Sequence, residues 1–158
     1  MRILSLSLIA LFFIALIPFI ALSYNIEQPF TTIYVPEKAS PSNWIKENQI
    51  KVYSDKVVIE MPNVQWAKFT DSNSMDPAID SDSNALEVIP SSYEDIHVGD
   101  IISYEISEIN GTIIHRVVET GFDESGWYAK TKGDNIPEQD PFKIRFENVK
   151  RIVIAIIY

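Results

Sequence analysis

Residues 100–119 read DIISYEISEINGTIIHRVVE and decide the fold. Two runs rich in isoleucine, valine and tyrosine flank the dipeptide Asn110-Gly111. β-Branched and aromatic residues favour strands, and Asn-Gly tolerates the positive φ angles of a two-residue hairpin turn. The stretch therefore predicts an antiparallel hairpin, with strands over 100–109 and 112–119 and the turn at Asn110-Gly111.

Shorter runs of similar composition lie on both sides of this hairpin. They predict two short strands within 50–61 and further strands at 66–69, 86–89, 127–131 and 149–158. The polar stretch 71–84, rich in serine and aspartate, indicates a loop. No segment after Ile50 has the period of an amphipathic helix. The expected fold class for 50–158 is mainly β, a coiled antiparallel sheet or partly open barrel.

The N-terminal part of the chain is apolar. Residues 3–22 contain no charged side chain, and a run of about 20 apolar residues has the length of a membrane-spanning helix. We assign 1–23 to a transmembrane signal anchor, with Arg2 on the cytoplasmic side and the rest of the chain exported. The alternative is a signal peptide cleaved near Ala21-Leu22-Ser23, and both readings export residues 50–158.

Residues 24–49 contain three prolines without a sustained period and indicate a connector, in which Ser42 could cap a short helical turn.

Composition excludes several classes of function. The net charge of −9 makes nucleic acid an improbable partner, and the absence of cysteine excludes disulfides and thiol catalysis. The segment 80–84 begins like a calcium loop but lacks its glycine and its final glutamate, so we expect neither metal nor cofactor.

The reactive side chains are few. His115 stands in the middle of a predicted strand, where it is either a hydrogen-bonded core histidine or a general base. His97 precedes a strand and is interpreted as structural or surface. Ser74 lies in the polar loop 71–84, where it is either a turn residue or a nucleophile that needs a base.

Three blocks in order resemble the signal peptidase I family, over roughly residues 66–158. The first, 72–77, reads SNSMDP and is similar to the family's serine box. The second combines 99–102, GDII, with 114–118, IHRVV, and is similar to the strand that bears the catalytic base. The third, 131–135, reads TKGDN. Each block is weak alone, but their order makes the resemblance specific.

The resemblance implies an enzyme and names its residues. His115 occupies the position of the lysine base of bacterial members, so the chain resembles the archaeal and endoplasmic-reticulum branch with its Ser-His mechanism. It implies Ser74 as nucleophile, His115 as base, Asp140 as the partner that orients His115, and Asp134 in support, although Asp134 could also only shape a turn. It further implies the backbone N–H of Ser74 as oxyanion donor.

Ser72 and Met75 complete the predicted site, as an additional oxyanion donor and a substrate-binding residue. The expected protein is a single-pass membrane serine endopeptidase, which cleaves exported preproteins after small residues on the extracytoplasmic face. Its expected partners are these preproteins and membrane lipid. Asn73 replaces a common glycine, Ile136 replaces an asparagine, and the segment 78–98 is longer and more acidic than usual. A degenerate member that binds peptides without cutting, or one dedicated to a single substrate, stays open.

Overall fold

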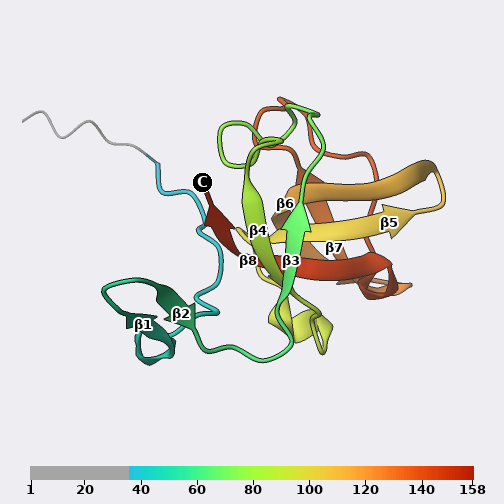
Figure 1. Cartoon of the computed structure of the whole chain (residues 1–158). Coiled ribbons are helices and arrows are strands. Elements are labelled where there is room, and N and C mark those ends of the chain that lie inside the picture. Colours follow the sequence, from blue (N-terminus) through green and yellow to red (C-terminus); the bar gives the residue numbers. More distant parts are fainter. Residues whose placement is uncertain (1–35) are drawn as a thin grey trace, which may run out of the picture. The chain divides into compact units, whose positions relative to one another are not determined.

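The computed structural model describes residues 36–158 (Figure 1). Residues Lys38–Tyr158 form one compact unit, which contains all the secondary structure described below. The predicted transmembrane anchor over 1–23 lies outside the described residues. Within them, no helix is long and apolar enough to cross a bilayer.

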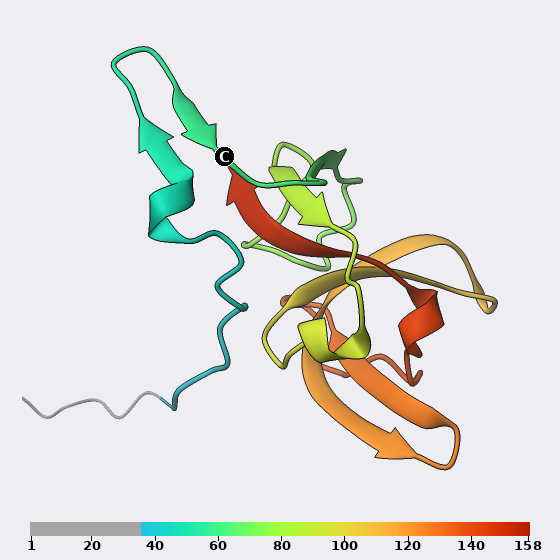
Figure 2. The same cartoon turned by 90° about the horizontal axis from the view of Figure 1, so that it is seen from below.

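Eight strands make up the described unit, and all pairings are antiparallel, which confirms a mainly β fold. The strands are β1 (Ile50–Val52), β2 (Val57–Ile59), β3 (Gln65–Lys68), β4 (Asn84–Val88), β5 (Ile101–Ile106), β6 (Ile109–Asp123), β7 (Gly126–Lys132) and β8 (Val149–Ile157). β1 and β2 form a two-stranded sheet, which projects away from the larger sheet in Figure 2. The other six strands form one sheet in the order β3-β4-β8-β5-β6-β7. The described strands do not close into a barrel, because β3 and β7 stay unpaired edges.

The two faces of the six-stranded sheet bury two separate clusters, as alternation along a strand requires. One cluster centres on Ile102, Tyr104 and Val117, and the other on Met75, Ala85 and Ile101. β8 lies between β4 and β5, so the apolar run near the C-terminus is a central strand with Ile152 and Val153 buried.

The hairpin turn was predicted at the wrong place. Ile106 of β5 pairs with Ile109 of β6, so the two-residue turn is Ser107-Glu108. Asn110 and Gly111 lie within β6, where the register with β5 shifts between Tyr104 and Ile106. Gly111 has φ +115°, but Asn110 is not among the residues with positive φ. The dipeptide therefore forms a bulge next to the turn, because only one of its residues takes the left-handed conformation.

The predicted cap at Ser42 is also wrong. The short helical turn near it is a 3-10 helix at Glu47–Gln49, preceded by Lys46. Ser42 instead donates to the buried carboxylate of Asp100, through its backbone N–H at 2.6 Å and its hydroxyl at 3.1 Å. The end of the predicted connector thus packs on the β-sheet unit. The other helices of the described unit are 3-10 turns at Tyr93–Asp95 and Phe146–Asn148, in agreement with the missing helical period.

Candidate active site

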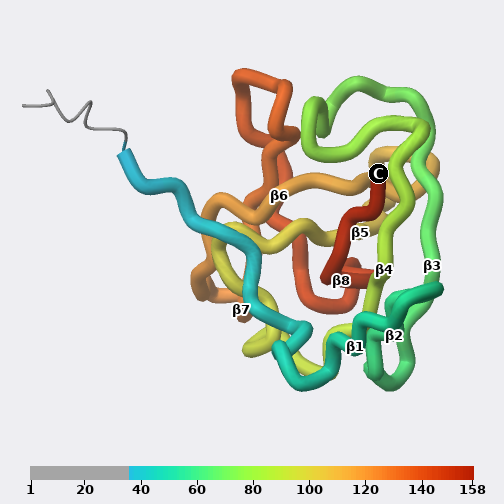
Figure 3. The backbone as a smooth tube through the Cα atoms, turned by 60° about the vertical axis from the view of Figure 1, so that its left-hand side comes forward, coloured from blue at the N-terminus to red at the C-terminus, as the bar shows by residue number. Residues whose placement is uncertain are grey.

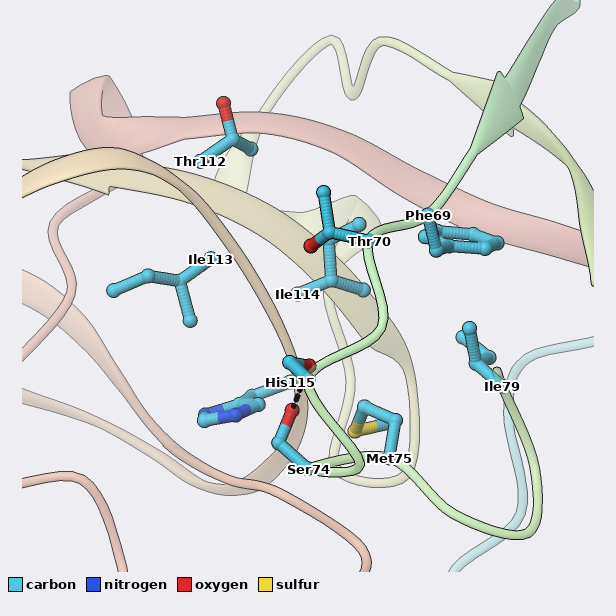
Figure 4. Close-up of a pocket in the computed structure, with 10 residues that line it drawn as sticks. Phe69, Thr70, Ser74, Met75, Ile79, Thr112, Ile113, Ile114 and His115 are labelled. Atoms are coloured by element: carbon cyan, nitrogen blue, oxygen red, sulfur yellow. Dashed lines mark hydrogen bonds between the residues drawn. The ribbon is translucent and has the colours of Figure 1, made fainter. Parts of the chain in front are cut away.

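A pocket of about 210 Å³ lies between the loop that follows β3 and the first half of β6 (Figure 4). The loop supplies Ser72, Ser74 and Met75, and β6 supplies residues 112–115 including His115. Figures 1 and 3 show that this loop and the segment after β7 lie at the same end of the sheet. The fold therefore brings together residues from two of the three sequence blocks in one cavity, with the third beside it.

Ser74 sits in a tight turn whose backbone is fixed from both sides. Asn73 takes φ +55°, a left-handed conformation that asparagine and glycine tolerate better than other residues. Met75 is 3% exposed and anchors the turn in the second apolar cluster. The carbonyl oxygen of Ser74 accepts a hydrogen bond from the backbone N–H of Asn135 at 3.0 Å. Met75, expected from the sequence to bind substrate, is seen here to hold the serine turn in place.

The hydroxyl of Ser74 lies 3.2 Å from that of Ser72, as the dashed line in Figure 4 marks. Within the described part of the chain, no direct hydrogen bond joins the hydroxyl of Ser74 to His115. The backbone N–H of Ser74 has no acceptor there either. It is therefore available as the oxyanion donor that the sequence implied.

His115 projects from the middle of β6 and is 7% exposed. Its Nδ1 lies 2.7 Å from Oδ2 of Asp140, so the Asp140 carboxylate orients the ring. With Nδ1–H donated to Asp140, the proton-accepting nitrogen of a neutral imidazole is Nε2. Of the two predicted aspartates, it is therefore Asp140 that forms a hydrogen bond with His115.

Asp140 has further partners that sequence reasoning missed. The hydroxyls of Tyr104 and Thr131 donate to the same Oδ2, at 2.9 and 2.6 Å. Burial would raise the pKa of Asp140, but the hydrogen bonds from His115, Thr131 and Tyr104 outweigh it and hold that pKa below the ordinary 3.8. Burial likewise raises the pKa of Tyr104, so its hydroxyl keeps its proton and stays a donor. Thr131 opens the third block, but nothing in the sequence singled out Tyr104 from the other strand residues.

Gly133 lies where the serine turn and the histidine ring meet. A Cβ atom added to it would stand 2.6 Å from the carbonyl oxygen of Ser74 and 3.1 Å from Nε2 of His115. Only a residue without a side chain fits between them. The side-chain amide of Asn135 donates to the carbonyl of Asn73 at 3.0 Å, which fastens the third block to the serine turn.

Asp134 does not contact His115. Its two oxygens accept from Nε and Nη2 of Arg116, at 2.7 and 2.6 Å, in a bidentate ion pair. Nη1 of Arg116 donates to the carbonyl of Gly99 at 2.8 Å. Asp134 therefore joins the third block to the strand that carries the histidine. Arg116 also links the two parts of the second block, because it binds the carbonyl of Gly99.

His97 lies away from this pocket, with its side chain 63% exposed and its Nδ1 3.2 Å from the hydroxyl of Ser42. Across residues 36–158, no group of three histidine, aspartate or glutamate side chains is arranged to hold a metal ion.

Comparison with protein-family models, curated proteins and solved structures gave no match.

The arrangement contains the groups that acyl transfer to serine uses. It combines a hydroxyl in a cleft, an imidazole whose Nδ1 is held by a carboxylate, and a backbone N–H without an acceptor. The pocket is also open along one edge of the sheet. β6 pairs with β7 only from Arg116 onward, so among the described strands the outer edge of β6 up to His115 is unpaired.

Proposed function

We propose that the protein is a membrane-anchored serine endopeptidase of signal peptidase I type, which cleaves extended segments of exported proteins on the extracytoplasmic face. The observation that carries the proposal is the meeting of Ser74 and His115 at one pocket from distant points of the sequence, with Asp140 hydrogen-bonded to His115. The three blocks by which the sequence resembles the family supply Ser74 and His115 to the lining of the pocket, and Gly133 and Asn135 to the contacts around it. The proposed anchor at 1–23 would keep enzyme and substrate in one thin layer.

In the proposed reaction, Oγ of Ser74 attacks the carbonyl carbon of the scissile peptide bond while its proton passes to Nε2 of His115. Asp140 stabilises the imidazolium that forms. The backbone N–H of Ser74, with the hydroxyl of Ser72, faces the developing oxyanion. The imidazolium then protonates the leaving amine, and water, deprotonated by His115, hydrolyses the acyl-enzyme.

This reaction requires the hydroxyl of Ser74 to turn from Ser72 toward His115. The proposal assigns this change to rotation about the Cα–Cβ bond of Ser74, since catalytic hydrogen bonds often form fully only when substrate is bound. An extended substrate would add a strand to the unpaired edge of β6 at 112–114, opposite the loop residues that line the same pocket.

The test is cleavage of preproteins by the full-length chain purified in detergent, with the cut sites located by mass spectrometry. Ser74→Ala should abolish cleavage while the unfolding temperature stays unchanged, because the hydroxyl has only Ser72 as partner. Ser81→Ala, in the same loop but outside the pocket, should keep full activity. Equal cleavage by the Ser74→Ala variant would exclude Ser74 as the nucleophile.

A second candidate is a peptide-binding module that does not cut. The hydrogen bond of Ser74 to Ser72 rather than to His115 favours it. Such a module would bind preproteins equally well before and after Ser74→Ala and would release no fragments. Binding measured by fluorescence anisotropy alongside the cleavage assay separates the two functions.

A further inference from the structure

A second, larger pocket of about 550 Å³ opens on the same side of the sheet as Ser74. It shares Phe69, Thr70, Thr112 and Ile114 with the pocket at Ser74, so the two cavities adjoin each other. A polypeptide lying along the unpaired edge of β6 would pass both of them.

The floor of this second pocket is a polar row across neighbouring strands. Glu87 comes from β4, Arg151 from β8 and Ser103 from β5, and Ser103 pairs with Arg151 on one side and Ile114 on the other. The side chain of Glu87 is 7% exposed. A carboxyl at this depth is unusual without a strong partner.

Glu87 has no such partner. Among the described residues, neither of its oxygens accepts a hydrogen bond, and its Oε1 is buried without one. Its nearest cation is Arg151, with Nε 3.9 Å from Oε2, but the guanidinium of Arg151 donates to Gln65 instead. Burial raises the pKa of Glu87, and Arg151 only partly opposes that. A buried polar group of this kind requires an explanation, and a ligand that supplies the missing hydrogen bond is one.

The charges around the pocket restrict what that ligand can be. Three cations line it, Lys68, Lys150 and Arg151, against the two carboxyls Glu87 and Glu105. Lys150 and Glu105 already pair at 3.1 Å, and Thr112 donates to Glu105 at 3.0 Å. A basic side chain would meet the excess of cations, and an acidic one would meet Glu87. Hydroxyl and amide groups carry no charge, and they can both donate and accept, so they match the carboxyl in either protonation state.

We propose that the pocket around Glu87 is a specificity subsite, which takes a serine, threonine, asparagine or glutamine side chain of the bound polypeptide at a fixed distance from Ser74. The proposal rests on the proposed function in assuming that the ligand is a polypeptide. It adds a position of polar preference to the expected preference for small residues at the cut.

The experiment uses the full-length Ser74→Ala chain in detergent and a set of fluorescent peptides, in which each position in turn is threonine, its isostere valine, or lysine. Without cleavage, anisotropy measures binding alone. We expect one position at which threonine binds about tenfold more tightly than valine, as one hydrogen bond to a carboxylate provides. Glu87→Leu should remove that preference, and Glu87→Gln, which keeps an acceptor, should preserve it.

Glu87→Leu should fold, because replacing a buried unpaired carboxyl by an apolar side chain is neutral or stabilising, and Glu87→Met serves as a second variant of the same kind. Three outcomes would overturn the subsite: no position distinguishes threonine from valine, the preference survives Glu87→Leu, or lysine binds more tightly than threonine there. Cleavage of the same peptides by the native chain is measured separately. Cleavage without a Glu87-dependent preference refutes the subsite alone, and the preference without cleavage refutes the protease alone.

Discussion

At the scale of single residues, the site depends on which aspartate serves the histidine. Asp140 accepts from Nδ1 of His115 at 2.7 Å, whereas Asp134 is engaged with Arg116. Both carboxylates follow the same glycine in the sequence, and it is the resemblance that gives Asp140 the orienting role and Asp134 a supporting one. Hydrogen bonding separates them, because only the partner of Nδ1 fixes the tautomer and stabilises the imidazolium.

Asp140→Asn should therefore lower kcat by about 10³- to 10⁴-fold, because an amide in this place favours the wrong tautomer of His115. Asp134→Asn, the matched control, should lower kcat by no more than about tenfold, because it weakens a partly exposed ion pair outside the pocket. Steady-state kinetics on one peptide substrate compares the two variants. Equal losses would show that Asp140 has no special relation to the base.

The same carboxylate gives a readout that does not depend on catalysis. Since the pKa of Asp140 is lower in the folded chain than its ordinary value, the unfolded chain binds the proton more readily. The stability that Asp140 contributes is therefore present above about pH 4 and is lost as the pH falls through the folded pKa. Urea unfolding at pH 6 and pH 3 should show a smaller fall in stability for Asp140→Asn than for the native chain.

At the scale of elements, the bulge in β6 is the place where the sequence and the structure disagree. Gly111 has φ +115°, and nothing lies within 4 Å of the position that its Cβ would take. Gly111→Ala should thus lower the free energy of unfolding by about 1–2 kcal/mol through backbone strain alone. Asn110→Ala should change it by less than about 0.5 kcal/mol, because Asn110 does not need positive φ. A large loss of unfolding free energy in Asn110→Ala would contradict the bulge and support a turn at Asn110-Gly111.

The strands could be predicted because their signal is local. Runs such as Ile101–Ile106 and Val149–Ile157 are rich in β-branched residues, which favour strands whatever their partners are. The structure confirms every predicted strand to within a few residues. The turn could not be placed, because Asn-Gly suits a bulge as well as a turn and the register is set by pairing across strands. The contact of Tyr104 with Asp140 was equally out of reach, since it joins residues that are neighbours only in the folded chain.

In the sequence, only the three motif blocks point to the pocket at Ser74. Their residues do lie together, but the unpartnered carboxyl of Glu87 left no trace in the sequence, where it reads as one charge in a short strand. Local composition cannot predict burial that depends on the packing of several strands.

At the scale of the whole molecule, the residues just before β1 belong to the folded unit that carries the site. Asp100 is fully buried and accepts from Ser42 and from the backbone N–H of His97 at 2.8 Å. A Cβ on Gly99 would stand 2.4 Å from the carbonyl oxygen of Ser40, and Trp44 packs against the larger apolar cluster. The segment from Lys38 onward therefore closes one side of the core.

A fragment of residues 38–158 should fold and keep the pocket, whereas one of residues 50–158 should be destabilised. The shorter fragment loses both hydrogen bonds from Ser42 and leaves the Asp100 carboxylate buried with fewer donors. Hydrogen bonds to a charged group each contribute about 1.5–3 kcal/mol, so its free energy of unfolding should be lower by about 3 kcal/mol or more. Urea unfolding compares the fragments, with Ser42→Ala in the longer one as the control that removes the hydroxyl bond alone. Equal stability of the two fragments would mean that the unit begins at β1, as the sequence alone had suggested.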